Sequence, residues 1–383
     1  MSNIPKLRFP EFSGEWEEKK IIQFCEISAG GDIDKNNSQK EFSSSYPYSV
    51  YSNSLENKGL YGYANYYKID SDVVTVTGRG DVGHAVARHE KFVPIVRLLV
   101  CKPKNNENVN FLENAINKTK IFIESTGVPQ LTAPQLGNVK LFLPSLPEQQ
   151  KIADFLSNVD SIITAETKIL KTLQKKKKAL MQKLFTQQLR FKSDDGTDFP
   201  EWEEKKLGDV CSYIGGGTPS KKVKEYWNGN INWASVKDIT GKYLYETQDK
   251  ISQLGADSSA TNICEPDSLL LITRMSPGKT VITKCITAIN QDLKIVKSDI
   301  NVEFLHLLFQ SIQTKIDEKT SGTTVKGISI EGLNQIDIRL PCKVEQQKIA
   351  DCLSSLDLLI QTQQKVVTTW QQRKKALLQQ MFI

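Results

Sequence analysis

Two loops in this chain carry an arginine at a flexible turn, from which a guanidinium could reach into a groove of a ligand. They read TGRGD at 77–81 and TRMSPGK at 273–279. A guanidinium offers paired donors that match the acceptor edge of guanine, and one good contact of this kind contributes about 1–3 kcal/mol of discrimination. A surface arginine on a hairpin explains either loop alone, but the recurrence favours a binding role. The candidate residues are Arg79, Asp81, Arg274 and Lys279.

Three further segments offer hydroxyl groups and backbone amides, and two of them also ammonium groups, which suit phosphate oxygens. The clearest reads GGGTPSKK at 215–222, for which a solvated flexible loop is the alternative. The others are STG at 125–127 and its counterpart TSGTTVK at 320–326. The candidate residues in these segments are Ser125, Thr126, Thr218, Ser220, Lys221, Lys222, Thr323 and Lys326.

The motifs of enzymes that act on nucleotides or phosphates do not occur in the sequence. It contains no Walker-type phosphate loop, no GxGxxG between a strand and a helix, and no Asn/Asp-Pro-Pro-aromatic motif of an amino-methyltransferase. Asp267 follows a proline, but no Glu-x-Lys completes a nuclease-like cluster. The seven cysteines form no CxxC, and the three histidines complete no zinc spacing. We therefore predict no catalytic residue, no metal site and no cofactor in this chain.

Length and charge restrict the class of protein further. The 383 residues suffice for two or three domains. The net charge of +6 permits a polyanionic partner without requiring one. No apolar run approaches the ~20 residues of a membrane span, and the first residues lack the apolar stretch of a signal peptide. These features predict a soluble, cytoplasmic protein that does not bind a membrane.

The loops are positioned by an internal duplication of the chain. EWEEKK occurs at 15–20 and at 201–206, and EQQKIAD occurs at 148–154 and at 345–351. Between these words, DVVTVTGRGDVG at 72–83 aligns with DSLLLITRMSPG at 267–278, which places Arg79 on Arg274. The separation between matching words grows along the chain, which indicates loop insertions. Each half is therefore a variable body followed by a nearly constant tail.

The bodies read as mixed α/β. VVTVT and LLLIT are short apolar runs typical of buried strands, whereas FLENAIN and EFLHLLFQSIQ carry apolar residues at helical spacing. We predict a first domain at 1–146, a helix at 147–189, a second domain at 190–343 and a second helix at 344–383.

The tails carry apolar residues at alternating steps of four and three, the heptad pattern of a coiled coil. Glu166 and Lys177 interrupt the first stripe, and Gln363 and Lys374 interrupt the second at matching places. A helix lying on its own domain is the general alternative, but two matched stripes favour an antiparallel pair of rods on the order of 55 Å long. The predicted seam consists of Ile152, Leu156, Val159, Ile163, Leu170, Leu173, Ile349, Leu353, Leu356, Ile360, Val367 and Trp370.

The whole chain resembles the specificity subunit of a bacterial type I restriction-modification system. The resemblance rests on the tandem bodies and tails, on GGGTPSKK followed by INWASVKDI, and on PxxxEQQKIADFL with its echo KVEQQKIADCL. It implies two target recognition domains with a pseudo-twofold relation, each reading one half of a bipartite DNA site, and a helical pair that sets the spacer. The first body departs from the pattern, because it has Gly30-Gly31-Asp32 where the second has the GTPS sequence.

The resemblance also implies partners and places the chemistry on them. Two modification subunits would transfer a methyl group from S-adenosylmethionine to adenine N6, and commonly two restriction subunits would use ATP and Mg²⁺. The chain itself would be non-catalytic. Two other interpretations remain open, namely a stand-alone DNA methyltransferase or nuclease, and a two-headed adaptor that binds proteins.

Overall fold

The structure is a computed structural model that describes residues 3–119, 121, 130–322 and 325–383. Its contacts divide the chain into two compact units. The first unit contains 1–168 and 364–383, and the second contains 169–363. Each unit therefore includes one body and one part of each long helix. The predicted domain boundaries divide the chain by type of element instead, and they stay a prediction.

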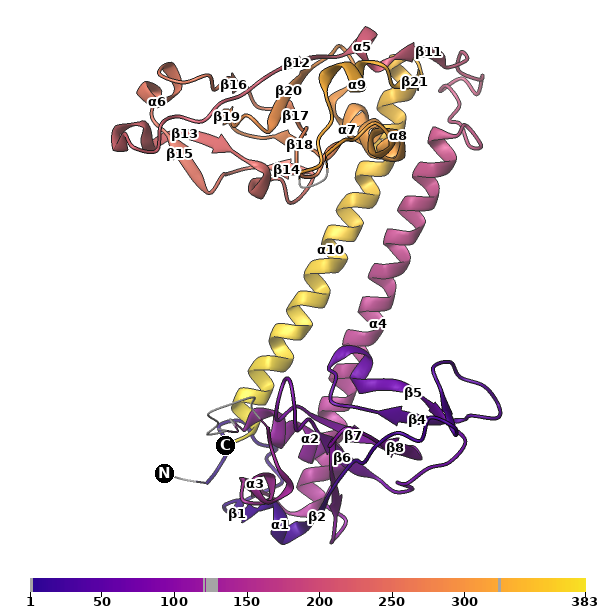
Figure 1. Ribbon diagram of the computed structural model, residues 1–383, viewed down its shortest axis with the longest axis vertical. Helices are drawn as coiled ribbons and strands as arrows, with labels where there is room; N and C mark the ends of the chain where they lie inside the picture. Colours follow the sequence, from indigo (N-terminus) through magenta and orange to yellow (C-terminus); the bar gives the residue numbers. More distant parts are fainter. Residues whose placement is uncertain (1–2, 120, 122–129, 323–324) are drawn as a thin grey trace. The chain divides into compact units, whose positions relative to one another are not determined.

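The body of the first unit, drawn in indigo and purple in Figure 1, is built around an antiparallel sheet with the order β2-β9-β6-β7. Its strands are β2 (Cys25–Ala29), β9 (Leu99–Pro103), β6 (Val73–Val76) and β7 (Ala85–Arg88). Strand β6 reads VVTV and is buried at all four positions, because it lies between two other strands and carries no charge.

A second sheet in this unit has the order β3-β5-β4-β8, in which β8 runs parallel to β4. Its strands are β3 (Ser38–Gln39), β5 (Leu60–Ala64), β4 (Tyr48–Tyr51) and β8 (Phe92–Pro94). A two-stranded ribbon joins β1 (Glu17–Lys20) to β10 (Lys140–Leu143). The short helices are α1 (Ile21–Phe24), η1 (Glu56–Gly59) and α3 (Ala133–Gly137).

The second unit has a five-stranded sheet of order β12-β20-β17-β18-β14 and a four-stranded sheet of order β15-β13-β19-β16. The first comprises β12 (Ser212–Ile214), β20 (Leu293–Lys297), β17 (Leu269–Ile272), β18 (Thr280–Thr283) and β14 (Tyr243–Leu244). The second comprises β15 (Asp249–Ile251), β13 (Trp227–Ala234), β19 (Thr287–Ile289) and β16 (Ile263–Cys264). A ribbon pairs β11 (Glu203–Lys206) with β21 (Asp337–Leu340). The short helices are α5 (Leu207–Val210), η2 (Lys224–Tyr226), η3 (Val236–Asp238), α6 (Gln253–Asp257), α8 (Gln313–Glu318) and α9 (Ile330–Asn334).

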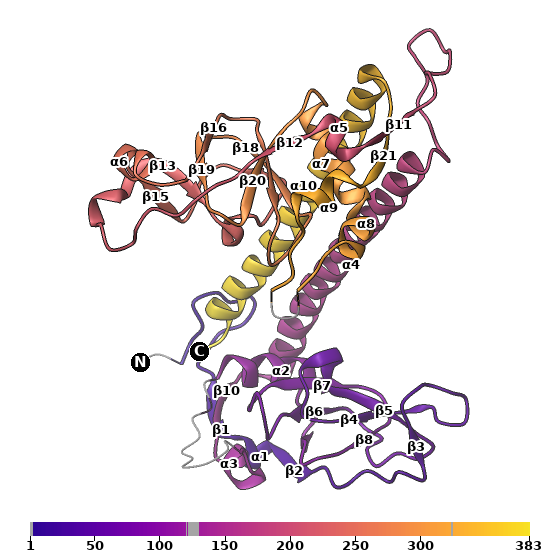
Figure 2. The same ribbon diagram turned by 45° about the horizontal axis from the view of Figure 1, so that its top comes forward.

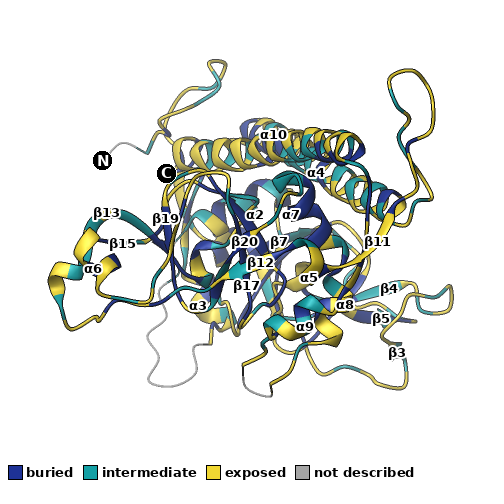
Figure 3. Ribbon diagram, turned by 90° about the horizontal axis from the view of Figure 1, so that it is seen from above, coloured by how far each residue is buried: buried dark blue, intermediate teal, exposed yellow. Residues whose placement is uncertain are grey.

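The pairing of strands repeats between the two bodies. Strand β17 lies between β18 and β20 as β6 lies between β7 and β9, and β13 runs parallel to β19 as β4 runs parallel to β8. In the second unit, dark blue in Figure 3 marks buried residues along β17 and β20. The predicted tandem of two α/β bodies is confirmed.

One helix covers the central sheet of each body. These helices are α2 (Val109–Lys118), which lies against β6 and β7 (Figure 2), and α7 (Val302–Ser311). Each begins at a capping asparagine, because the Asn108 side chain accepts from the Phe111 amide and the Asn301 side chain from the Phe304 amide, both at 3.0 Å. Phe111 and Phe304 are fully buried, so each cap holds in place the backbone of a phenylalanine that packs in the core of its body.

The predicted long helices are α4 (Leu146–Phe185) and α10 (Lys343–Met381). In the first unit Lys374 of α10 lies 2.6 Å from Asp160 of α4, and in the second unit Lys177 of α4 lies 2.6 Å from Asp357 of α10. Earlier residues of one helix thus meet later residues of the other in both units. The predicted antiparallel pairing of two long helices is confirmed.

The predicted seam residues fall into two groups by burial. Ile152, Leu156, Val159, Leu170, Ile349, Leu353 and Val367 are buried, and Ile163, Leu173, Leu356, Ile360 and Trp370 are half-buried. The first positions of each helix also belong to the core of a body, as Ile152 and Leu156 do in the first unit. Both helices mix exposed and buried residues along their length (Figure 3), and no described helix has the length and apolar content that crossing a membrane requires.

Candidate nucleic-acid interface

In the first body a glycine loop lies against the turn that follows β8. The Gly30 amide donates to the Leu98 carbonyl at 2.8 Å, and the Val96 amide donates to the Gly31 carbonyl at 2.8 Å. A Cβ on Gly30 would stand 2.7 Å from the Ile95 nitrogen, closer than atoms can approach. Only glycine therefore permits this contact.

The second body holds its glycine loop against the end of β19. The Gly217 amide donates to the Ile289 carbonyl at 3.0 Å, and a Cβ on Gly216 would stand 2.3 Å from that carbonyl oxygen. The glycines of the two loops thus perform the same structural task, although the first loop lacks the GTPS sequence. The difference between the loops lies in the side chains that follow the glycines.

Several predicted residues of the second body converge on the turn between β19 and β20. The Thr218 hydroxyl donates to the Gln291 side chain at 2.6 Å. Arg274 is exposed and lies 3.5 Å from the Asp292 carboxylate. The Met275 amide donates to the Lys326 carbonyl at 2.8 Å, which attaches the third predicted segment to the arginine loop. The structure therefore brings Thr218, Arg274 and Lys326 to one region.

The other predicted residues of the second body border this region with exposed side chains. Ser220 accepts from the Trp227 indole through its carbonyl at 3.2 Å, so its backbone is fixed while its side chain stays exposed. Lys221, Lys222 and Lys279 are exposed. Trp233 is buried and donates to the Gly217 carbonyl at 3.1 Å, so this indole supports the glycine loop from the core.

In the first body the predicted arginine loop is anchored by its flanks. Arg79 is exposed, pairs with Gln130 as an isolated bridge and reaches the Gln130 side chain at 3.4 Å. Asp81 is exposed, and its carbonyl accepts from the Thr77 hydroxyl. Ser125, Thr126 and Thr323 lie outside the described residues.

The buried histidine of the second body has a structural environment. His306 contacts the Thr280 hydroxyl at 2.8 Å and the Gln310 amide at 2.7 Å, and burial lowers its pKa to about 4. His89 lies on the surface of the first body, 3.2 Å from Asp72. Among the described residues, no three His, Cys, Asp or Glu side chains are grouped so that they could hold a metal ion.

The tryptophan of EWEEKK and an arginine that precedes this word meet the first glutamate of EQQKIAD at a buried ion pair in each unit. In the first unit Arg8 donates two hydrogen bonds of 2.8 Å to Glu148, which is 1% exposed, and the Trp16 indole donates to the same carboxylate at 3.3 Å. The hydrogen bonds to Glu148 raise the pKa of Arg8. The words therefore recur because they hold the body to the start of its long helix.

The second unit repeats this ion pair. Arg190 donates to Glu345 at 3.2 and 2.9 Å, and the Trp202 indole donates to Glu345 at 3.1 Å. Glu345 is completely buried. A charge at this depth is tolerated because it is paired and hydrogen-bonded on both oxygens.

Comparison with known families identifies what this duplicated architecture is. The family described as type I restriction modification DNA specificity domain matches residues 13–175 and again residues 200–369. The chain belongs to this family. Each match covers one body and most of the long helix that follows it, so the family's domain is the half-chain unit of the duplication. The resemblance that the sequence predicts is confirmed.

Curated relatives in this family are specificity subunits. The chain is 31% identical to the type I restriction enzyme MjaIX specificity subunit of Methanocaldococcus jannaschii over 47% of this chain and 44% of that protein. It is 31% identical to the EcoR124I/EcoR124II specificity subunit of Escherichia coli over 42% of each. A putative MjaX specificity subunit of M. jannaschii aligns at 25% identity over 98% of this chain and 95% of its own length. The chain thus spans less than half the length of the first of these relatives.

Solved structures show the same fold. The S subunit of a type I restriction-modification system from M. genitalium matches with a TM-score of 0.66 at 15% identity, covering 99% of both chains. A chain from a structure on complex assembly and conformational transition of the type I system matches with a TM-score of 0.59 at 19% identity, covering 96% of this chain and 97% of that one.

Within this family fold, the structure adds residues that the sequence did not single out. Val96, Arg97, Gln291 and Asp292 form the turns beside the arginine loops, and Asn53 links the first turn to Gly78. The alignment of the two halves places these turns at matching positions. This correspondence was the signal that could have found them.

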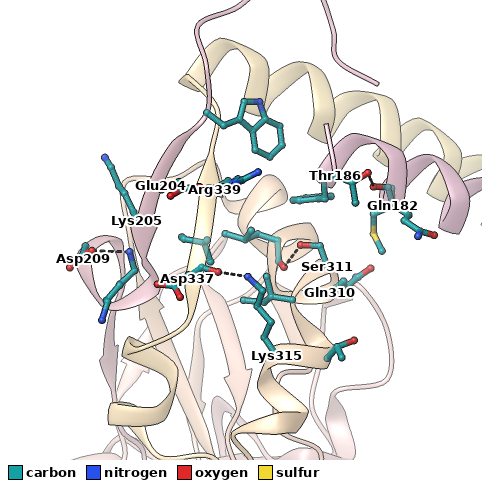
Figure 4. Close-up of a pocket in the computed structure, with 18 of the residues that line it drawn as sticks. Gln182, Thr186, Glu204, Lys205, Asp209, Gln310, Ser311, Lys315, Asp337 and Arg339 are labelled. Carbon is teal, nitrogen blue, oxygen red and sulfur yellow. Dashed lines mark hydrogen bonds and ion pairs between the residues drawn. The ribbon is translucent and has the colours of Figure 1, made fainter. Parts of the chain in front are cut away.

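A pocket of about 1100 Å³ opens in the second unit, away from these loops (Figure 4). It lies between the end of α4, β11, β21 and α7, and Trp202 and Phe185 are among its lining residues. Several of its charges are already engaged, since Arg339 donates to Glu204 at 2.7 Å and Lys315 donates to the Asp337 carbonyl at 2.7 Å. The pocket therefore borders the ribbon of β11 and β21, and its lining residue Trp202 donates to the buried Glu345.

Proposed function

We propose that this chain is the DNA specificity subunit of a type I restriction-modification complex, in which each body reads one half of a bipartite site. The observation that supports this most strongly is the loop cluster built twice. The glycine contact and the arginine loop recur in both bodies, whereas the side chains around them differ. Family membership supports duplex DNA as the ligand of this cluster, and unlike side chains on a common backbone suit two unlike half-sites.

The proposed DNA-facing residues are those that project from this cluster. In the first body they are Arg79 and Asp81, and in the second they are Thr218, Ser220, Lys221, Lys222, Arg274, Lys279 and Lys326. We include Ser125, Thr126 and Thr323 from the sequence alone. Lysine and hydroxyl groups would hold phosphates and fix the position of each body, while the arginines would contact bases.

Catalysis belongs to partner subunits in this proposal. Two modification subunits would transfer the methyl group from S-adenosylmethionine to adenine N6, and two restriction subunits would hydrolyse ATP with Mg²⁺ in the cytoplasm. The paired helices α4 and α10 would provide the surface for the modification subunits. They would also set the length of the unread spacer.

Binding and methyl transfer test the proposal together. The purified chain, alone and with its modification subunits, is incubated with a randomised duplex library and labelled S-adenosylmethionine. We expect salt-sensitive binding, because neutralised phosphates release counterions, and methylation only when the partners are present. Methyl transfer by the chain alone would instead indicate a stand-alone methyltransferase. The absence of DNA binding at low salt would favour a protein-binding adaptor.

The helical pair makes a separate prediction about the spacer. Deleting four residues, about one helical turn, from each of α4 and α10 should shorten the preferred spacer between the two half-sites. The half-sites themselves should stay the same. Sequencing of the selected duplexes measures both, and an unchanged spacer would contradict the role of the helices.

A further inference from the structure

The turn after β8 in the first body has an unusual backbone. Val96 has a φ of 54° and Arg97 a φ of 62°, so both adopt the left-handed region. Glycine and asparagine are the residues that favour this conformation, and a β-branched valine disfavours it strongly. Backbone strain of this kind concentrates at functional sites.

The surrounding loops hold the turn in this conformation. The Val96 amide donates to Gly31 at 2.8 Å, and the Arg97 amide donates to Gly30 at 3.0 Å. The Asn53 side chain donates to the Val96 carbonyl and accepts from the Gly78 amide at 2.7 Å. The glycine loop and the arginine loop therefore both support the turn.

The turn presents two unlike side chains to solvent. Val96 is 43% exposed, and Arg97 is exposed. Among the described residues, no side chain forms an ion pair or a hydrogen bond with the Arg97 guanidinium. A Cβ on Gly78 would lie 3.0 Å from the Arg97 carbonyl, so the loop of Arg79 begins directly beside the turn. Two guanidinium groups and one apolar group thus project from neighbouring positions.

The matching turn of the second body carries different chemistry on an equivalent frame. The Thr273 amide donates to the Asp292 carbonyl at 3.0 Å, so Asp292 lies beside the loop of Arg274. Arg97 lies beside the loop of Arg79 in the same way in the first body. Neither Gln291 nor Asp292 has a positive φ. Arg274 lies 3.5 Å from the Asp292 carboxylate, so a guanidinium and an acceptor stand where the first body has two guanidinium groups.

We propose that these turns are the base-contacting elements that make the two half-sites differ. Arg97, with Arg79, would contact guanine edges in the first half-site, and Val96 would offer an apolar contact such as a thymine methyl group accepts. Asp292 would accept from an exocyclic amino group of cytosine or adenine in the second half-site. This inference rests on the proposed function and names the residues that carry its specificity.

Two substitutions test the inference in the complex with the modification subunits and a randomised duplex library. Arg97→Asp, which copies the second body, should change the base preference of one half-site by about 5- to 150-fold, the range of one good base contact, and leave the other unchanged. Val96→Gly should raise the thermal midpoint, because glycine relieves the left-handed strain. It should nevertheless weaken selectivity in the same half-site. A residue with a purely structural role would not combine these two effects.

Lys102→Ala provides the matched control, because it removes an exposed charge from β9, the strand that follows the turn. It should leave the selected motif unchanged. Arg97→Gln keeps the length of the side chain and serves if Arg97→Asp does not fold. This inference alone is overturned if the Arg97 and Val96 variants select the wild-type motif. It is also overturned alone if they lose affinity equally for all DNA sequences. A wild-type complex that selects no bipartite motif would overturn the proposed function and this inference with it.

Discussion

The two units carry different titratable residues beside their pairs of ions between α4 and α10. In the first unit, Glu113 of α2 lies near Asp160 and Lys374. In the second unit, His306 of α7 lies near Asp357 and Lys177. Each residue stands five positions after the capping asparagine of its helix. Burial raises the pKa of Glu113 and lowers the pKa of His306 to about 4, so burial disfavours the charged form of both groups. The same place in the fold thus holds an acid in one unit and a base in the other.

This difference sits inside a frame that the two units share. The buried ion pairs at Glu148 and Glu345 have the same partners in the two halves, and in both halves a glycine, Gly30 or Gly216, closely approaches the backbone beside a turn. Duplication has kept the residues that join each body to its long helix. The residues on the covering helix and at the loop turns have been free to change.

The largest expected effect tests the shared frame. Glu148→Ala and Glu345→Ala should each lower the free energy of unfolding by about 3–5 kcal/mol, because each leaves a partly buried arginine and a buried indole without their acceptor. The losses should be similar in the two units. Chemical denaturation, followed by hydrogen exchange of peptides from each unit, measures them.

Surface carboxylates provide the controls for this experiment. Glu17→Ala and Glu203→Ala, each exposed on the ribbon strand of its unit, should change stability by no more than about 0.5 kcal/mol. If one of the two variants at the buried carboxylates lost less than about 1 kcal/mol of stability, the ion pair would not stabilise the two units equally, which would contradict the prediction.

The second prediction concerns pH and separates the two units. Unfolded histidine has a pKa of about 6.5, so between pH 6.5 and about 4 the unfolded chain binds a proton that the folded second unit does not. The stability of the second unit should therefore fall as the pH is lowered through this window, by up to about 3 kcal/mol in total. The lysines Lys242 and Lys177 act in the same direction, whereas Glu303 and Asp357 oppose it.

Glu113 should change the stability of the first unit with pH in the opposite direction. Its raised pKa means that the folded first unit keeps a proton which the unfolded chain has released, so this group lowers stability as the pH rises above its ordinary pKa.

His306→Gln, which cannot titrate, should remove the acid sensitivity of the second unit only. Thermal unfolding between pH 4 and 7 measures this, and an unchanged pH profile in the variant would contradict the assignment.

The smallest expected effect concerns the ion pairs between α4 and α10. Lys177→Ala and Lys374→Ala should each cost about 1 kcal/mol or less, because both pairs retain access to solvent. Lys374→Ala should cost less, since its partner Asp160 is 49% exposed. Denaturation of Lys175→Ala, an exposed residue of the same helix α4 as Lys177, gives the control. A larger effect at Lys374 than at Lys177 would reverse the predicted order.

The elements that follow from local pattern could be predicted from the sequence. The heptad stripes predicted helices at 147–189 and 344–383, close to Leu146–Phe185 and Lys343–Met381. The apolar runs VVTVT and LLLIT became the central strands β6 and β17. Side-chain period and β-branched composition report such elements directly, because they act over neighbouring residues.

Contacts between distant residues could not be predicted in the same way. Valine and arginine at 96 and 97 give no sign of positive φ, since tertiary contacts to Gly30, Gly31 and Asn53 impose it. Lys177 interrupts the apolar stripe of its helix, but its pairing with Asp357 depends on the register of two helices far apart in the chain. The sequence also could not show that Asp292 lies beside Arg274.

The role of this chain in DNA recognition is measured by sequencing of DNA methylation in cells with and without it. We expect that removing the chain abolishes methylation at one bipartite adenine motif, and that Arg97→Asp alters a single half of that motif. Methylation that persists unchanged without the chain, or a lost motif with no two-part structure, would contradict it.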